Sequence, residues 1–416
     1  MKAFSRRASK IQSDFSSVLE PQLRAAPRIL YLQYQDPAAY PPLEHSSRIL
    51  AERGWEVVFV GASVTRDASL KLDPHPRVVV KSIGVVPAKL QGLRYLYFTF
   101  YSLCWILFWR PKWIYGSDPI VLPALYVLAK LTAARILYHE HDSPTGREAG
   151  SPFRRLVLRC RNLVGQSASV CVLPQSQRLL EFLQATQRTK PTLCVWNCPR
   201  RSEGRANLAP SDGTLVLYYH GSINAARLPP ELVLAIASFR GAVRLIVAGY
   251  EVQGSIGHID TLRCLAAANG LADAVQYVGA IPLRSDLLLY AAQAHVGLSL
   301  MPLISDSINT RNMVGASNKA FDCMGCGLPL LVSDLPEWVD AFVVPGFARA
   351  CDPGSVESIR SALAWYLENP QMRAEMGDRC REKIRASWNY ESMFESVLAE
   401  LSASEKLVAA NVRVTA

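Results

Sequence analysis

The sequence predicts an α/β protein in which two doubly wound parallel sheets face each other across a cleft. Three observations carry this prediction. Short apolar runs rich in β-branched and aromatic residues alternate with helical periodicity, which is typical of parallel strands covered on both faces. The chain has 416 residues, half of them hydrophobic, which suffices for two or three domains. The polar segment 198–213 interrupts the alternation with Gly, Pro and Ser and indicates a linker.

The first series of elements predicts one domain over residues 27–197. It follows a polar, basic segment, residues 1–26, that we expect to be a flexible tail. The first strand is expected at 28–34, followed by a proline-containing loop and an amphipathic helix that ends near Gly54. Further apolar runs predict strands at 56–61, 77–83, 112–118, 135–142, 169–174 and 192–197, and a helix over 121–132.

The second series predicts a domain over residues 214–386. Strands are expected at 214–221, 243–249, 274–279, 295–300 and 328–334. Helices are expected at about 230–240, 256–269, 284–293, 317–326, 355–367, 370–386 and 390–405. Because open α/β sheets bind ligands at the carboxyl ends of their strands, we look for the site residues in the loops that follow strands.

The charge is distributed unevenly along the chain. Residues 1–200 carry 27 Lys and Arg against 13 Asp and Glu, whereas residues 201–416 carry 18 against 22. The first half is therefore expected to face an anionic partner such as nucleic acid, phospholipid head groups or a phosphorylated acceptor. A merely basic surface is the alternative.

The segment 95–109 is an uncharged apolar run of fifteen residues, too short to cross a bilayer comfortably. One interpretation is a core helix packed on the sheet. The other is a helix at the membrane interface, with Tyr95, Tyr97, Trp105 and Trp109 at head-group level. The cluster formed by Arg154, Arg155, Arg159 and Arg161 would then bind anionic lipid, unless it is simply a solvated helix face.

The sequence lacks the motifs of several common nucleotide, cofactor and metal sites. The chain has no GxGxxG after its first strand and no GxxxxGK[ST], which argues against nicotinamide and P-loop nucleotide chemistry. The cysteines offer one CxxC, Cys323 and Cys326, and a pair four residues apart, Cys194 and Cys198, without turn-like flanks. We therefore expect no metal, and reduced thiols in a cytoplasmic compartment.

Two segments of the second half are suited to holding phosphate. HGSIN (220–224) follows a strand, so backbone N–H groups near Gly221 and Ser222 could approach a phosphate that Arg227 would neutralise. In GASNKAFDCMGCGLP (315–329), Ser317 and Asn318 stand at an expected helix N-terminus, with Lys319 and Asp322 in its first turns. A helix N-terminus attracts anions, and an acid one turn in can accept hydrogen bonds from ribose hydroxyls.

The motifs of this chain match a family. They are YPPLEHSSRILAERGWEVVFVG (40–61), YGSDP (115–119), YHEHD (138–142), NCP (197–199), YHGSIN (219–224) with Arg227, and SNKAFDCMGCGLPLLVSD (317–334). From Arg28 to about Leu401 the sequence resembles bacterial glycosyltransferases of the GT-B fold, in particular the retaining glycosyltransferase family 4. RASWNY (385–390) is similar to the point where the last helices of that family cross back, so residues 387–405 are expected to return to the first domain.

The resemblance implies two Rossmann-like domains, with a nucleotide-diphospho-sugar donor in the second and a glycan or lipid-linked acceptor in the first. It implies that Gly221, Ser222 and Arg227 face the diphosphate and that Ser317, Asn318 and Lys319 hold diphosphate or sugar. Asp322 would bind the ribose, and the backbone at Val278 and Gly279 would contact the nucleobase. His141 would lie beside the transferred sugar. The alternative for His141 is a structural role as a hydrogen-bonded histidine of the core, and the alternative for Asp322 is a role as an acidic residue on a helix surface.

The expected reaction is retaining transfer of a hexose in bacterial cell-surface or exopolysaccharide synthesis. It would occur in the cytoplasm or peripherally at the inner membrane face, without metal or nucleic acid. Arg227, Lys319 and the helix N-terminus would stabilise the charge of the leaving diphosphate. The sequence departs from the family at Val314, which stands where the first residue of an acidic pair is usual. A non-catalytic GT-B binding protein and a nucleotide-sugar epimerase of similar fold are the alternatives.

Overall fold

The computed structural model describes residues 26–63, 70–144, 150–252 and 254–414, and it contains two parallel β-sheets. In the described residues the first sheet has the strand order β3-β2-β1-β4-β5-β6-β7, and the second β10-β9-β8-β11-β12-β13. Neighbouring strands are parallel throughout. The expected pair of doubly wound parallel sheets is confirmed.

The strands of the first sheet are β1 (Arg28–Gln33), β2 (Glu56–Ala62), β3 (Val78–Ile83), β4 (Trp113–Ser117), β5 (Arg135–His139), β6 (Val170–Leu173) and β7 (Thr192–Cys194). Those of the second are β8 (Leu215–Ile223), β9 (Val243–Glu251), β10 (Val275–Gly279), β11 (Val296–Ser299), β12 (Leu330–Ser333) and β13 (Ala348–Cys351). The sequence analysis missed β13, because its four residues, ARAC, include an arginine and make no apolar run.

The helices of the first half are α2 (Pro41–Glu52), α3 (Gln91–Trp109), α4 (Leu122–Leu131), α5 (Pro152–Ser167) and α6 (Ser176–Thr186). Those of the second are α7 (Pro230–Ala237), α8 (His258–Ala268), α9 (Arg284–Ala292), α10 (Ile308–Arg311), α11 (Asn318–Gly325), α12 (Pro336–Trp338), α13 (Val356–Glu368), α14 (Pro370–Ala386) and α15 (Tyr390–Val414). Between the sheets lies the short 3-10 helix η6 (Arg201–Glu203).

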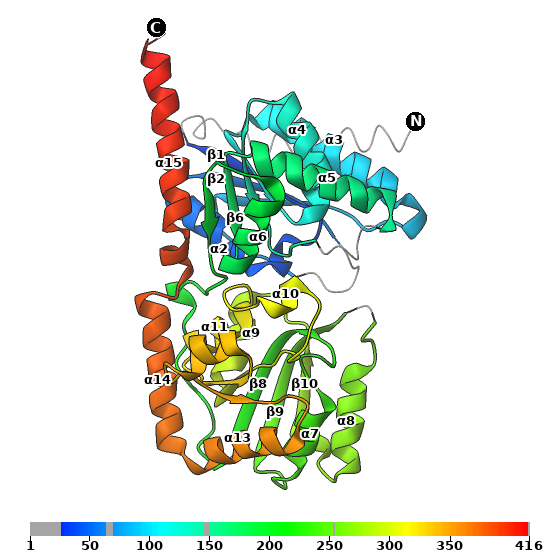
Figure 1. Cartoon of the computed structure of the whole chain (residues 1–416), viewed down its shortest axis with the longest axis vertical. Helices are drawn as coiled ribbons and strands as arrows, with labels where there is room; N and C mark the ends of the chain where they lie inside the picture. Colours follow the sequence, from blue (N-terminus) through cyan, green and yellow to red (C-terminus); the bar gives the residue numbers. More distant parts are fainter. Residues whose placement is uncertain (1–25, 64–69, 145–149, 253, 415–416) are drawn as a thin grey trace.

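Each sheet is covered by apolar side chains on both faces. The helices α3, α4 and α5 pack together on one face of the first sheet (Figure 1). On its other face, α2 is joined by Tyr390, Phe394 and Val397 of α15, which are fully buried. The last helix of the chain thus completes the core of the first sheet, and Figure 1 shows α15 running alongside that half of the molecule.

The strand order places the ligand-binding edge of each sheet. It reverses beside β1 and β4 in the first sheet and beside β8 and β11 in the second. At such a switch point the loops leaving the carboxyl ends of adjacent strands diverge and leave a crevice. The loops after β1, β4 and β5 and those after β8, β9 and β10 therefore carry the residues that face between the two halves.

The apolar segment 95–109 lies within α3, and its aromatic residues do not lie as the membrane interpretation expected. Trp105 and Trp109 are buried in the core of the first sheet, and Tyr95 and Tyr97 are half-buried against it. The outer face of α3 is nevertheless apolar. It exposes Leu93, Leu96, Phe100, Leu107 and Phe108.

The arginine cluster also divides into two groups. Arg154, Arg155 and Arg159 are exposed on α5, whereas Arg161 is buried. Its guanidinium donates two hydrogen bonds to the Glu140 carboxylate, at 2.6 and 2.7 Å. Arg161 is therefore structural, and the expectation that it binds lipid with the other three was wrong. In the parts of the chain that the structure describes, no helix is long and apolar enough to cross a membrane.

Candidate functional site

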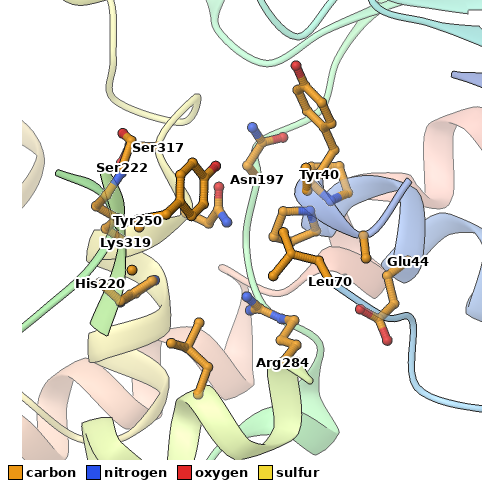
Figure 2. A pocket seen from close by; sticks show the side chains of 18 of the residues that line it. Tyr40, Glu44, Leu70, Asn197, His220, Ser222, Tyr250, Arg284, Ser317 and Lys319 are labelled. Carbon is orange, nitrogen blue, oxygen red and sulfur yellow. The ribbon is translucent and has the colours of Figure 1, made fainter. Parts of the chain in front are cut away.

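A cavity of about 330 Å³ lies between the two halves of the molecule, where the carboxyl edges of the sheets meet. We call it the donor cavity, after the donor that the sequence resemblance leads us to expect there. Figure 2 shows residues of the first half, including Tyr40 and Glu44, opposite Ser222, Ser317 and Lys319 of the second. The cavity is lined by the loops after β1, β2 and β5, by the ends of β8 and β9, by the loop after β10 and by the start of α11. The loop after β4, which the strand order led us to expect there, does not line it.

Most residues singled out from the sequence meet in this cavity. His141, Gly221, Ser222, Arg227, Ser317, Asn318 and Lys319 all line it. Val278 and Gly279 do not, because the wall is formed by the next three residues, 280–282. Asp322 does not line it either.

Glycines let the carboxyl ends of the paired strands β8 and β9 approach each other closely. Gly221 has φ +106° and Gly249 φ +153°, conformations that side chains with a Cβ rarely adopt. A Cβ on Gly249 would collide with the carbonyl oxygen of Gly221, and a Cβ on Gly221 would lie 2.8 Å from Cε of Lys319. The glycines therefore leave room for the Lys319 side chain and for a ligand beside it.

The N-terminus of α11 presents an anion-binding surface to the donor cavity. Ser317 occupies the N-cap position, and its buried hydroxyl has no hydrogen-bond partner among the described residues. Lys319 follows in the first turn, and its Nζ lies 5.9 Å from the centre of the Tyr219 ring. Burial, and then the charge of Arg227, lower the pKa of Lys319 to about 7. Two cations face the cavity, and each makes the other's charge costly until an anion binds.

His141 lies in the loop after β5, because that strand ends at His139 rather than at residue 142. The centre of its ring lies 4.9 Å from that of Tyr40, with the two rings tilted by 32°, and neither nitrogen has a hydrogen-bond partner in the described parts of the chain. Burial, and then the charge of Arg178, lower its pKa to about 3. His141 is therefore a neutral imidazole at physiological pH, with both nitrogens available to a ligand.

Asp322 belongs to a buried network of ion pairs beneath the donor cavity. Its two carboxylate oxygens accept hydrogen bonds from Arg284, and one of them lies 3.1 Å from Nε2 of His220. Burial opposes ionisation of Asp322, but the neighbouring Arg284 outweighs it and holds the pKa of the carboxyl below its usual value. The expected contact between Asp322 and a ribose is not supported by this geometry. Arg284, which does line the cavity, stands in front of it.

The network extends from Arg284 to the first half of the molecule. Nε of Arg284 donates to Glu203 at 2.7 Å, and the same carboxylate lies 3.0 Å from Nε2 of His45 on α2. Burial disfavours the Glu203 carboxylate, yet Arg284 and His45 hold its pKa well below the usual value. One arginine thus connects α11, the linking helix η6 and α2.

Sequence reasoning missed Arg284, Glu203 and Arg178, and no motif marks any of them. Arg178 is fully buried and donates to the backbone oxygens of His141 and Asn312, one on each half of the molecule. Asn197, part of the NCP motif, similarly donates to the backbone oxygen of Ala316 at 2.7 Å. These residues act through long-range contacts that leave no local spacing.

The donor cavity carries the chemistry of an anion site. In the described ranges, no three His, Cys, Asp or Glu side chains gather where they could hold a metal ion. Arg227, Lys319 and the backbone N–H groups at the start of α11 line the donor cavity from the second half of the molecule. Lys71 of the first half and Arg284 line it as well, but Arg284 is already paired with Asp322 and Glu203. Such an arrangement can bind a diphosphate and stabilise charge that develops on it.

Comparisons with known proteins agree with this fold. Residues 200–383 match the sequence family described as glycosyl transferases group 1. Sucrose-phosphate synthase from Thermosynechococcus elongatus superimposes with a TM-score of 0.70 at 15% identity, over 92% of this chain and 100% of that one. HepE from Anabaena, in complex with UDP and glucose, superimposes with a TM-score of 0.66 at 15% identity, over 90% of this chain and 99% of that one. WaaG, a glycosyltransferase involved in lipopolysaccharide biosynthesis, superimposes with a TM-score of 0.60 at 13% identity, over 88% of this chain and 98% of that one.

A search of curated proteins gives no match to this sequence. The structural similarity extends over nearly the whole chain, although the sequence identity is low. It confirms the GT-B fold that the motifs led us to expect.

Replacing Arg284 by Met should destabilise the protein strongly, because it leaves the carboxylates of Asp322 and Glu203 buried without their partner. We expect a loss of about 3–5 kcal/mol in the free energy of unfolding, measured by urea denaturation with tryptophan fluorescence. Arg360→Met, which removes an exposed ion pair with Glu357, is the control and should leave the transition unchanged. Equal effects of the two substitutions would contradict the importance of the network.

Proposed function

We propose that this chain, whose residues 200–383 match the group 1 glycosyl transferases and whose fold is GT-B, transfers a sugar from a nucleotide-diphospho-sugar to an acceptor. The observation that carries the proposal is the convergence of Lys319, Arg227 and the start of α11 on the donor cavity, opposite His141. HepE, one of the similar structures, was solved with UDP-glucose. From that structure we infer for this chain only the class of donor, a nucleotide-diphospho-sugar.

The reaction that we propose breaks the bond between the anomeric carbon and a diphosphate oxygen. The leaving nucleoside diphosphate keeps the electron pair, and Lys319 and Arg227 stabilise its growing charge more than they stabilise the bound donor. The acceptor hydroxyl oxygen forms the new bond to the anomeric carbon, and its proton passes to the departing diphosphate oxygen. His141, as a neutral imidazole, hydrogen-bonds the transferred sugar.

A non-catalytic nucleotide-sugar binding protein is the second candidate, and a specific observation favours it. Val314 replaces the first acid of the family pattern, and Asp322 is occupied by Arg284 and His220. Neither position therefore offers a free carboxylate to the donor. Hydrolysis of a nucleotide sugar by the purified protein separates an enzyme from a binder.

We further propose that the protein binds the cytoplasmic face of a membrane through α3, α4 and α5, where a lipid-linked acceptor would be found. Exposed apolar side chains gather on these three neighbouring helices: Leu93, Leu96, Phe100, Leu107, Phe108, Val127, Leu131, Phe153 and Leu156. We call them the apolar face. Arg154, Arg155 and Arg159 are exposed on the same helix as Phe153 and would contact anionic head groups. The sequence resemblance further leads us to propose a role in bacterial cell-surface or exopolysaccharide synthesis, with a hexose as the transferred sugar.

Nucleoside diphosphate binding should weaken as the pH rises from 7.5 to 9. Lys319 loses its charge above a pKa of about 7 in the empty cavity, so binding of the anion must take up a proton. Where the bound lysine stays charged, the affinity falls by up to about tenfold per pH unit, measured by calorimetry with UDP, GDP and ADP. In this pH range the terminal phosphate of the nucleotide is already ionised, so its own titration does not contribute to the change in affinity.

Lys319→Ala should bind more weakly and lose this pH dependence, whereas Arg227→Ala should bind more weakly and keep part of it. Each should reduce donor hydrolysis on the order of 100-fold. An unchanged pH dependence in Lys319→Ala would show that another group titrates, and unchanged hydrolysis in both variants would contradict the donor site.

His141→Ala should lower the turnover of donor hydrolysis more than it weakens nucleoside diphosphate binding, because His141 faces the sugar. Since its pKa of about 3 keeps it neutral, the shape of the pH–rate profile between pH 5 and 9 should stay the same. Kinetics and calorimetry on one preparation measure both effects. Collapse of nucleotide affinity would mean that His141 serves the diphosphate instead.

The protein should float with vesicles that contain anionic lipid at low salt, and this binding should fall at high salt. Changing Arg154, Arg155 and Arg159 together to Ser, or Leu96 and Phe100 together to Ser, should weaken it. Ile256 and Ile304, which are exposed on the second half of the molecule, give the matched apolar control when changed to Ser. Absence of binding at low salt would remove the membrane proposal and leave the transferase proposal intact.

A further inference from the structure

A second cavity of about 330 Å³ opens on the first half of the molecule, behind His141. It shares a wall with the donor cavity, because Gln35, Tyr40, His141 and Asp142 line both. A transferase must hold an acceptor hydroxyl beside the sugar that it moves. A cavity that touches the donor cavity through one layer of side chains meets that requirement, and its size is within the range of small-ligand sites.

One wall of this second cavity is polar and carries Asp118 of the YGSDP motif. Asp118 follows β4 and has φ +76°, a backbone conformation that is rare for residues other than glycine and is often kept where function requires it. One oxygen of its buried carboxylate accepts from the backbone N–H of Ile120 at 3.0 Å, and the Tyr40 hydroxyl is hydrogen-bonded to the same carboxylate. Both unpartnered nitrogens of His141, which is 5% exposed, lie in the shared wall.

The side of the cavity that belongs to α5 is mostly apolar, although the exposed Arg154 also lines it. Its apolar residues include Phe153 and Val157, and the Phe153 ring lies 5.3 Å from that of Tyr95 on α3. Phe153 is also a member of the apolar face. The cavity therefore combines hydrogen-bonding carboxylates on one side with an aromatic ring on the other, and it continues outward into an apolar surface.

The charges of the cavity limit what it can hold. Two carboxylates, Asp118 and Asp142, line it, against one cation, the exposed Arg154 at the start of α5. Arg178 lies 3.7 Å from Asp142 but does not line the cavity. A phosphate placed beside His141 would face like charge, whereas sugar hydroxyls can donate hydrogen bonds to both carboxylates.

We propose that this cavity is the acceptor site and that it takes an uncharged, hydroxyl-rich sugar ring attached to an apolar group. Asp118 binds the hydroxyls of that ring, Phe153 packs against its apolar side, and the apolar group leaves along α5. The acceptor is thus a glycolipid whose sugar, rather than a lipid phosphate, receives the new residue. The inference rests on the proposed function and names the acceptor class for the same site.

The test uses hexyl glucoside, hexyl galactoside and hexyl mannoside as probes, with hexyl phosphate as the charged alternative. Saturation-transfer NMR measures their binding to the full chain, saturated with whichever of UDP, GDP or ADP binds. At least one hexyl glycoside should bind, and hexyl phosphate should not. Asp118→Asn, which keeps the shape but removes the charge, and Phe153→Ala should each raise the dissociation constant of the glycoside about tenfold or more.

Nucleotide affinity should be unchanged in both variants, because neither residue lines the donor cavity. Asn162→Ala, an exposed position of α5 outside both cavities, is the control and should bind the glycoside as the parent does. Binding of hexyl phosphate in place of the glycosides, or glycoside binding that both variants retain, would overturn the acceptor site. Absence of any nucleotide binding would instead contradict the proposed function itself.

Discussion

The structure depends on the buried contact between Arg284 and Asp322, because it fixes α11 and through it one wall of the cavity between the two halves. A guanidinium and a carboxylate that both lose water must satisfy each other, and here two parallel hydrogen bonds do so. The same arginine holds Glu203 in the crossing between the two halves. Arg284 therefore constrains both the orientation of Lys319 and the position of the linking segment. A change in the position of one should shift the other.

Periodicity alone was enough to predict most of the architecture. Strands such as β1 and β12 are buried on both faces, so their apolar runs are unbroken and visible in the sequence. The start of α11 was equally visible, since Ser317 and Asn318 are cap residues and the anion site follows from helix geometry. Asp322 could not be placed in this way, because only the fold brings Arg284, 38 positions away, against it.

The same limit explains the errors on the first half. Composition cannot tell which side of a helix meets the core. In α3, Trp105, Trp109 and Phe98 face inward, whereas another phenylalanine, Phe100, faces outward. Arg161 resembles its neighbours in sequence, but it lies two positions after the exposed Arg159, which turns its side chain to the opposite face of the helix, where Glu140 neutralises it. The amphipathic character of these helices was thus detectable, whereas the direction of each face required the packed structure.

The packing of α15 has a consequence for the order of events during synthesis. Tyr390, Phe394 and Val397 fill the core beneath the first sheet, although they follow every element of the second. A ribosome therefore releases the strands of the first sheet long before the helix that seals one of its faces has been made. Among the side chains that the structure describes, Met393 is the one residue of α15 that packs against the cores of the second half, which can therefore close earlier. The first half must wait with apolar surface uncovered, so chaperone binding during translation is expected to concentrate on α2 and its neighbouring strands.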